Sequence, residues 1–266
     1  MNIRRSSAIV LRIFYLMRGS FTRVFPLFAW AAIDIILWGF ITRYLDTVQS
    51  TFNFVSTLLG AVLLWDFFTR AMFGVSTSFF EDVWSRNFLN IFATPLRISE
   101  YLTGLIAASM MTSFIGLIVM LLMAGLIFGL WIFSYGLVVL ILLLGLFLFG
   151  IAFGIFAIGI VLRFGPAAEW FIWPMPAVLA PVAAVFYPVS VLPIWLQPIA
   201  RILPASYIFE ALRAVVAGQA IPMYSLWIGC ILSVVYVFLA SWFFRRMYLH
   251  AVRTGLVARY SAESIS

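Results

Sequence analysis

Lysine is absent from this chain, and every one of its sixteen Lys or Arg positions is arginine. A P-loop needs a lysine that reaches the β- and γ-phosphates of a nucleotide, so that nucleotide site is excluded. Schiff-base catalysis through a lysine amine is excluded for the same reason. Any ATP-driven work must therefore be done by another subunit.

Cysteine and histidine are almost as scarce, with one of each in 266 residues. Cys230 cannot form an internal disulfide and is expected to pack in an apolar stretch, as buried free cysteines do. His250 has no cysteine or acidic cluster beside it, so no metal site is expected. The sequence also shows no set of nucleophile, base and oxyanion donors, which argues against an enzyme.

Charge of either sign is rare. Charged residues make up 9% of the chain and hydrophobic residues 65%, whereas a soluble domain has about 25% charged residues. The stretches 101–162, 170–200 and 214–244 contain no Asp, Glu, Lys or Arg. Because a helix needs about 20 apolar residues to cross the hydrocarbon, these stretches predict transmembrane spans. We expect an all-α membrane protein with a single transmembrane domain over 1–266.

Six spans are predicted, preceded by an N-terminal helix over 1–22 that lies along the membrane surface. This helix places Ile3, Ile9 and Ile13 on one side and most of its arginines on the other, the pattern of an interfacial amphipathic helix. The spans are expected at 25–45, 54–78, 101–128, 133–162, 168–192 and 222–244.

The distribution of arginine predicts the orientation. Six spans place both termini on one side, where twelve arginines gather, and only three lie on the opposite side. Loops rich in Lys and Arg stay in the cytoplasm, so both termini are predicted to be cytoplasmic. The net charge of +7 is explained by this topology signal, and no nucleic-acid partner is expected.

The segment 188–213 is apolar yet interrupted by Pro188, Pro193, Pro198 and Pro204. Each proline removes a backbone donor and clashes with the preceding turn, so one continuous helix is excluded. Unpaired backbone is not tolerated against lipid. We therefore expect a broken external segment that is buried in protein, lines a wet cavity or sits at the membrane interface, as in a pathway across the bilayer.

Three charged residues, Asp34, Asp66 and Arg70, lie deep within the predicted spans, away from their ends. Asp66 and Arg70 are one helical turn apart and are expected to pair and face the bundle interior. Asp34, in the first span, has no partner nearby in the sequence and is expected to face Arg70 or a polar cavity. These residues either bind the first two spans together or contribute to a pathway or gate.

Two glycine pairs could let helices approach closely. They are Gly125-x-x-x-Gly129 and Gly150-x-x-x-Gly154, spaced as in packed membrane helices. The chain has seventeen glycines, so the pattern carries little weight alone.

The loop between the second and third spans carries an amphipathic helical pattern over 81–97. Trp84, Phe88, Ile91 and Phe92 form an apolar stripe, and polar residues occupy the opposite side. Such a helix either rests on lipid headgroups or docks into a soluble partner. The pattern alone does not decide between them.

Taken together, these features resemble the type-2 permease family of ATP-binding-cassette exporters. The resemblance covers the whole plan of the chain and is carried by Ala93-Thr94-Pro95-Leu96-Arg97 within 92–100, by Tyr187-Pro188-Val189-Ser190-Val191-Leu192-Pro193, and by Leu203-Pro204 through Glu210, Arg213 and Gly218.

The resemblance implies a mechanism in which this chain holds no cofactor. Two copies would form the pathway, and two separate ATPase subunits would bind ATP and Mg²⁺ below. The 81–97 segment would be the coupling helix, and 188–213 would form short external re-entrant helices that cap the outer mouth. The implied contact residues for the ATPase are Trp84, Arg86, Phe88, Asn90 and Phe92, and the implied outer gate comprises Pro188, Pro193, Pro204, Glu210 and Arg213.

The resemblance also implies export across a bacterial inner membrane. The expected substrate is an amphipathic lipid, glycoconjugate or polysaccharide, with a small hydrophobic drug as the second choice. The alternative function is an ion-coupled secondary transporter or channel that uses Asp34 and Asp66. A scaffold subunit without substrate flux is a third possibility.

Overall fold

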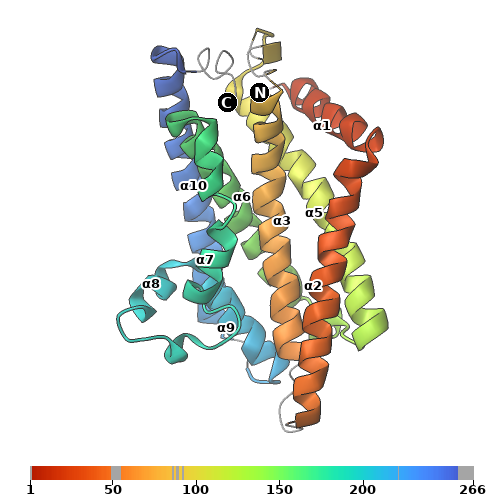
Figure 1. The fold of residues 1–266 in the computed structure, drawn as a ribbon. Coiled ribbons are helices and arrows are strands. Elements are labelled where there is room, and N and C mark those ends of the chain that lie inside the picture. The colour runs from red at the N-terminus through yellow and green to blue at the C-terminus, as the bar shows by residue number, and fades with distance from the viewer. Residues whose placement is uncertain are drawn as a thin grey trace.

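The structure is a computed structural model that describes residues 2–48, 55–85, 87, 90–91, 93–220 and 222–256, with backbone only at 26 and 27. These residues form a bundle of long, roughly parallel and antiparallel helices (Figure 1) and contain no strand. The predicted all-α fold of a membrane protein is therefore confirmed.

Among the described residues, five helical segments are long and apolar enough to cross a membrane. They coincide in sequence with five of the six expected spans and continue a few residues beyond most of the expected ends. The segments are α2 (Phe21–Val48), the π-turn η1 (Val55–Leu59) with α3 (Gly60–Trp84), α5 (Ile98–Phe128), α6 (Val138–Phe164) and α10 (Met223–Arg253).

The expectation of one continuous span at 168–192 is wrong. This stretch contains the end of η3 (Pro166–Phe171), the short helix α7 (Met175–Val182) and irregular backbone beyond it. Pro174 precedes α7, Pro176 lies in its first turn and Pro181 in its last. Because each proline lacks a backbone donor, the helical ladder cannot run through all three. A broken element thus returns from the end of α6 toward α9.

The proline-rich segment 188–213 forms three short helices, η4 (Val189–Val191), α8 (Gln197–Ile202) and α9 (Pro204–Val216). The prolines sit at helix starts, where a missing N–H costs nothing. Pro188 is the N-cap of η4, and Pro204 is the first residue of α9. Pro193 instead accepts hydrogen bonds from the backbone of Leu196 and Gln197 in the turn that enters α8.

The core lies where α3 and α6 cross, flanked by α5 and α10. Gly150 and Gly154 of α6 face α3, and methyl groups added there would come within 2.6 Å of the Phe68 backbone oxygen and 2.7 Å of the Met72 backbone oxygen. This glycine pair therefore allows the two helices to touch. The pair Gly125 and Gly129 does not bring two helices together. Gly129 instead ends α5 with a φ of 73°, before the 3₁₀ turn η2 (Ile132–Tyr135).

Replacement of Gly154 by alanine is expected to destabilise the bundle by about 1–3 kcal/mol, the usual cost of overpacking. The added methyl meets backbone, so the helices must separate. Gly145→Ala on the same helix is the matched control, because its methyl meets the flexible end of Ile208. Thermal unfolding of the purified proteins in detergent measures both, and equal losses of stability would contradict this packing.

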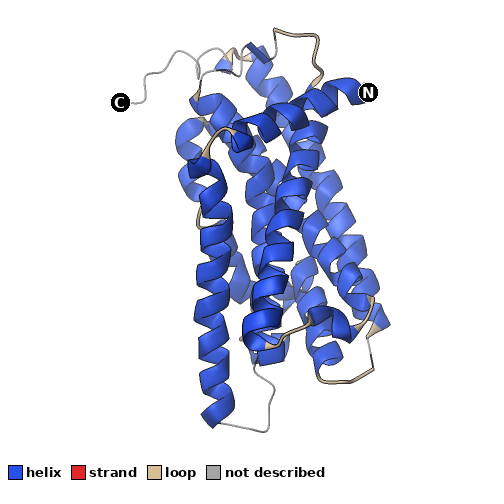
Figure 2. Cartoon of the chain, turned by 90° about the vertical axis from the view of Figure 1, so that its right-hand side faces the viewer, coloured by secondary structure: helices blue, strands red, loops and turns tan. Residues whose placement is uncertain are grey.

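Helix α1 (Ile3–Arg18) lies across one end of the bundle and joins α2 through a sharp elbow (Figures 1 and 2). Its Asn2 side chain caps the first turn by accepting from the Arg4 N–H at 3.1 Å. The end of α10 reaches the same end of the bundle (Figure 1). We call this the α1 end. The opposite end, where α9 lies, is the α9 end.

Candidate functional site

The most extensive polar site in the described part of the chain lies at the α1 end and centres on Asp82. This carboxylate is near the last turn of α3 and is only 4% exposed. Arg12 of α1 donates to one of its oxygens, and the hydroxyl of Tyr101, on α5, donates to the other at 2.6 Å. A buried carboxylate is stable only when it is paired and hydrogen-bonded. Asp82 thus binds three helices together.

A second buried carboxylate, Glu100, fixes the first turn of α1. It accepts from the backbone N–H of Asn2 at 2.7 Å and from that of Arg97 at 3.1 Å. Arg5 lies 3.4 Å from the same carboxylate and also donates to the backbone oxygen of Pro95. Helix α1 is thereby tied directly to the loop that leads into α5.

Close packing reinforces these polar contacts. Gly104 of α5 lies under α1, and a methyl group there would come within 2.6 Å of the Ile9 Cβ. Ile9 and Ile13, from the apolar side of this amphipathic helix, are buried in this contact. The arginines on the other side differ from the expectation, because Arg5 and Arg12 bind protein carboxylates rather than only facing headgroups.

A third ion pair follows the elbow. Arg23 of α2 lies 2.9 Å from Glu81 of α3, and both side chains are about 40% exposed. Exposed pairs of this kind contribute little to stability. We call the whole set the charged network: Arg5, Arg12, Arg23, Glu81, Asp82, Glu100 and Tyr101.

Trp84 extends the same site toward η3. It is the last residue of α3, its ring is 41% exposed, and its indole N–H donates to Glu169 at 2.8 Å. Partial burial raises the pKa of Glu169, and the hydrogen bond from Trp84 acts against that rise. The end of α3 is therefore linked to α1, α5 and the broken element at once.

The expected coupling helix over 81–97 is only partly described. Glu81 to Trp84 continue α3 rather than starting a new helix, which corrects the expected start. Asn90 is helical, and its side-chain amide donates to Asn87 at 3.3 Å. The other three predicted contact residues, Arg86, Phe88 and Phe92, lie outside the described residues.

The intramembrane charges come together from separate helices. Arg70 lies 2.9 Å from Asp66, as the helical spacing predicted, and their side chains are 10% and 15% exposed. Gly116 of α5 faces Arg70, with 2.9 Å between an added methyl and its guanidinium. Asp34 of α2 interacts electrostatically with both residues. The three groups join α2, α3 and α5.

At the α9 end, Arg213 organises the proline-rich segment. Its guanidinium donates to the backbone oxygens of Ala184 and Val185 at 3.1 and 3.2 Å. Burial lowers the pKa of Arg213 to about 10, while nearby Glu210 opposes the change. The guanidinium therefore remains charged at neutral pH. Ala184 has a φ of 53°, a conformation that costs energy in a residue other than glycine.

The predicted outer-gate residues come from several elements of the proline-rich segment. Glu210 and Arg213 lie one turn apart on α9, whereas Pro188 and Pro193 lie in the loop between α7 and α8, and Pro204 starts α9. The prolines interrupt the helices, and Arg213 makes the hydrogen bonds to the turn after α7. Within the described ranges, no three His, Cys, Asp or Glu side chains come close enough to bind a metal ion.

Sequence reasoning missed most of the charged network. Glu81, Asp82 and Glu100 flank the amphipathic loop, and Glu169 follows α6. One feature of the sequence could have indicated these residues. Half of the eight described acidic residues occur at the end of the bundle where arginine also concentrates. The sequence did not show which arginine meets which carboxylate, because the partners are 58 to 95 positions apart.

Comparison with known protein families gives one match. A family model described as ABC-2 type transporter matches residues 11–217, well over half of the chain. The matched range begins within α1 and ends just after α9, so it contains the proline-rich segment and every residue of the charged network except Arg5. A comparison with curated proteins finds no match.

Proposed function

The chain belongs to the ABC-2 type transporter family, and on that basis we propose that it is the permease subunit of an ATP-driven exporter. A permease of this kind provides the membrane pathway and holds no nucleotide. The absence of lysine agrees with a nucleotide site on another subunit, because a P-loop cannot be built without a lysine. ATP and Mg²⁺ would bind to a separate ATPase subunit.

The observation that carries the proposal is the junction at the end of α3. The loop that follows α3 is expected to dock on the ATPase, and the charged network ties both of its flanks to α1. Asp82 binds Arg12 before the loop, and Pro95 and Glu100 bind Arg5 after it. A displacement of the loop would therefore move α1, α3 and α5 together, which is what ATP-driven coupling requires.

The exposed face of α2 supports a pathway built from two copies of the chain. The residues of that face are large and apolar, and they line a shallow groove. The family resemblance places the first span at the interface between copies. Two ATPase subunits would then bind below the pair. The groove residues are Ile33, Ile36, Leu37, Phe40, Ile41 and Tyr44.

The proposed substrate is an amphipathic lipid, glycoconjugate or polysaccharide, with a hydrophobic drug as the second choice. The proposed location is the bacterial inner membrane with both termini in the cytoplasm. The gathering of arginine at the α1 end supports this orientation through the positive-inside rule. Membrane lipids would surround the exposed faces of α5 and α10.

The ion-coupled alternative rested on Asp34 and Asp66. The Asp66 carboxylate is paired with Arg70 at 2.9 Å, and a paired carboxylate is a poor proton carrier. The family to which the chain belongs favours ATP as the energy source, and transport driven by ATP needs no ion gradient. We therefore propose that Asp34, Asp66 and Arg70 hold α2, α3 and α5 together.

The coupling role of Trp84 gives a test of this function. Trp84→Ala is expected to weaken ATPase recruitment about tenfold, a typical effect for an interface tryptophan, with normal membrane insertion. Arg86→Glu is expected to act in the same direction. Trp84→Phe distinguishes the aromatic contact from the hydrogen bond to Glu169, because it keeps an aromatic ring, of smaller area, and removes the indole N–H.

Trp227→Ala is the matched control, since this tryptophan is 68% exposed near the α9 end of α10. Complex yield after affinity purification and ATP hydrolysis by the complex are the two measurements. If Trp84→Ala and Arg86→Glu both gave normal yield and normal hydrolysis, the docking role of the loop would be refuted.

A further inference from the structure

An apolar cavity of about 300 Å³ fills the inner corner of the elbow between α1 and α2. Its walls come from α1, from the start of α2 and from the middle of α5. Phe14, Met111 and Ile115 are each close to half exposed, so the cavity opens to the outside of the bundle. The size falls at the lower end of the range for ligand sites in proteins. The remaining apolar wall residues are Val10, Ile13, Met17, Val24, Phe28 and Ala108.

The polar lining of this cavity consists of one cation and the hydroxyl of Thr112, which donates to the backbone oxygens of Ala108 and Ser109. Arg18, the last residue of α1, belongs to its lining and is exposed. It forms no ion pair with any residue in the described ranges. An apolar cavity with a single unpaired cation fits an amphiphile that has a hydrocarbon tail and an anionic head.

The acidic residues at the α1 end are not available to neutralise Arg18. Glu81 and Asp82 are paired with Arg23 and Arg12, and Glu100 accepts two backbone N–H groups. Glu169 accepts from Trp84. Among the described residues, a second copy of the chain therefore offers no free carboxylate at this level of the bundle. At the α1 end of the described chain no carboxylate is thus left for Arg18, and an anion from another molecule can pair with it.

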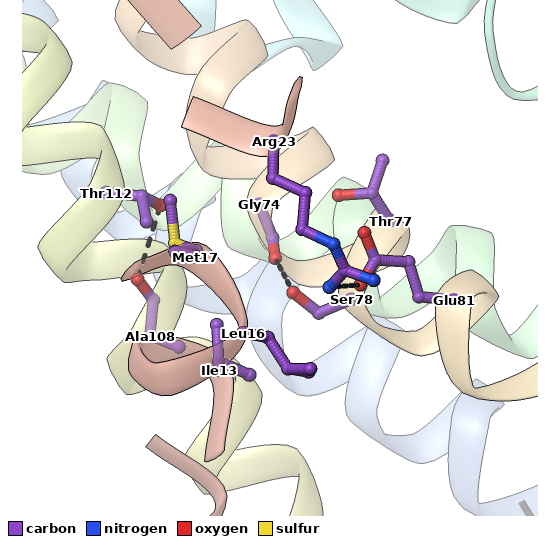
Figure 3. Close-up of a pocket in the computed structure, with 10 residues that line it drawn as sticks. All are labelled: Ile13, Leu16, Met17, Arg23, Gly74, Thr77, Ser78, Glu81, Ala108 and Thr112. Carbon is purple, nitrogen blue, oxygen red and sulfur yellow. Dashed lines mark hydrogen bonds and ion pairs between the residues drawn. The ribbon is translucent and has the colours of Figure 1, made fainter. Parts of the chain in front are cut away.

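Helix α1 is also loosely packed on the side that faces α3. A smaller cavity of about 120 Å³ lies there, between α1, α3 and α5, and Figure 3 shows its lining. Ile13 and Met17 of α1 line both cavities. The Arg23–Glu81 ion pair closes the smaller one (Figure 3). The position of the second half of α1 thus depends on what fills the larger cavity.

We propose that this elbow cavity binds an anionic phospholipid of the surrounding leaflet. One acyl chain lies between α1, α2 and α5, and the phosphate pairs with Arg18. Interfacial helices bind anionic membranes through buried apolar area and through attraction between arginine and the headgroup. The bound lipid fills the space under α1. It thereby stabilises the position of α1, which carries Arg5 and Arg12 of the charged network.

Lipid binding to the full chain in detergent, measured by native mass spectrometry, tests this site. The probes are dioleoylphosphatidylglycerol, which is anionic, and dioleoylphosphatidylcholine, which has no net charge. The wild type is expected to prefer the anionic lipid. Arg18→Gln is expected to weaken its binding about fivefold, the contribution of one arginine near an anionic surface, and to leave phosphatidylcholine binding unchanged.

Two matched controls separate the site from the general charge of α1. Arg4→Gln removes the same charge from the exposed first turn of α1, outside the cavity, and is expected to leave binding unchanged. Ile115→Trp fills the cavity and should weaken both lipids, whereas Ile118→Trp, on the exposed lipid side of α5, should not. Equal effects of Arg4→Gln and Arg18→Gln, or no preference for the anionic lipid, would overturn the proposal.

Discussion

Replacement of Arg12 by alanine is expected to lower the free energy of unfolding by about 3–5 kcal/mol, the cost of leaving a buried charge without its partner. Asp82 is 4% exposed, and without Arg12 it would keep only the hydroxyl of Tyr101. The same change should release α1 from α3. ATPase stimulation is therefore expected to fall together with stability.

A double-mutant cycle distinguishes loss of the ion pair from loss of side-chain packing. Asp82→Asn removes the buried charge, so the Arg12→Ala/Asp82→Asn variant should lose much less stability than the sum of the two single changes. Arg23→Ala is the control on the exposed pair with Glu81 and should cost about 0–1 kcal/mol. If Arg12→Ala and Arg23→Ala had similar effects in equilibrium unfolding, Asp82 would not be the centre of the network.

Replacement of Arg213 by alanine is expected to cost about 3 kcal/mol and to disorder the turn after α7. The guanidinium makes two hydrogen bonds, each of which contributes roughly 1.5–3 kcal/mol because the donor is charged. The acceptors belong to Ala184 and Val185, both fully buried, so no water can replace the lost donor. The strained backbone at Ala184 would then relax.

Both hydrogen bonds come from one guanidinium nitrogen, Nη1. Lysine is expected to rescue Arg213 only in part, because its ammonium lies one bond closer to the backbone than Nη1 and must stretch to reach the two carbonyls. Arg201→Ala is the matched control, because Arg201 is exposed on α8 and makes no hydrogen bond or ion pair with other described residues. Limited proteolysis of the 183–203 segment, alongside thermal unfolding, reports the effect. Protection of Arg213→Ala at the wild-type level would show that other contacts hold this segment.

Hydrophobicity alone predicted five long helices to within a few residues at most ends, because an apolar run of this length has few alternatives in a bilayer. It failed at 168–192, where average hydrophobicity is high but Pro174, Pro176 and Pro181 interrupt the hydrogen-bond ladder. Proline interrupts a helix at 174–181 for the same reason that it excludes a continuous helix through 188–213. The structure thus extends the broken region further toward the end of α6.

Local spacing predicted the Asp66–Arg70 pair, since residues four apart on a helix are neighbours. It could not predict the contacts of Asp82 or Glu100, whose partners lie on another helix. Those contacts depend on the angle at which α1 crosses the bundle, which is set by Gly104 and by the elbow. The fold class and the pairs within one helix can therefore be predicted from nearby residues. The candidate coupling site cannot, because it depends on how α1 packs against α3 and α5.

The central claim is that this chain works as a permease driven by a separate ATPase, and purification of the full chain from its native membrane in mild detergent tests it most directly. The account predicts that a soluble subunit with a P-loop co-purifies in a fixed ratio and that the complex hydrolyses ATP. A lone oligomer without such a subunit and without ATP hydrolysis would contradict it.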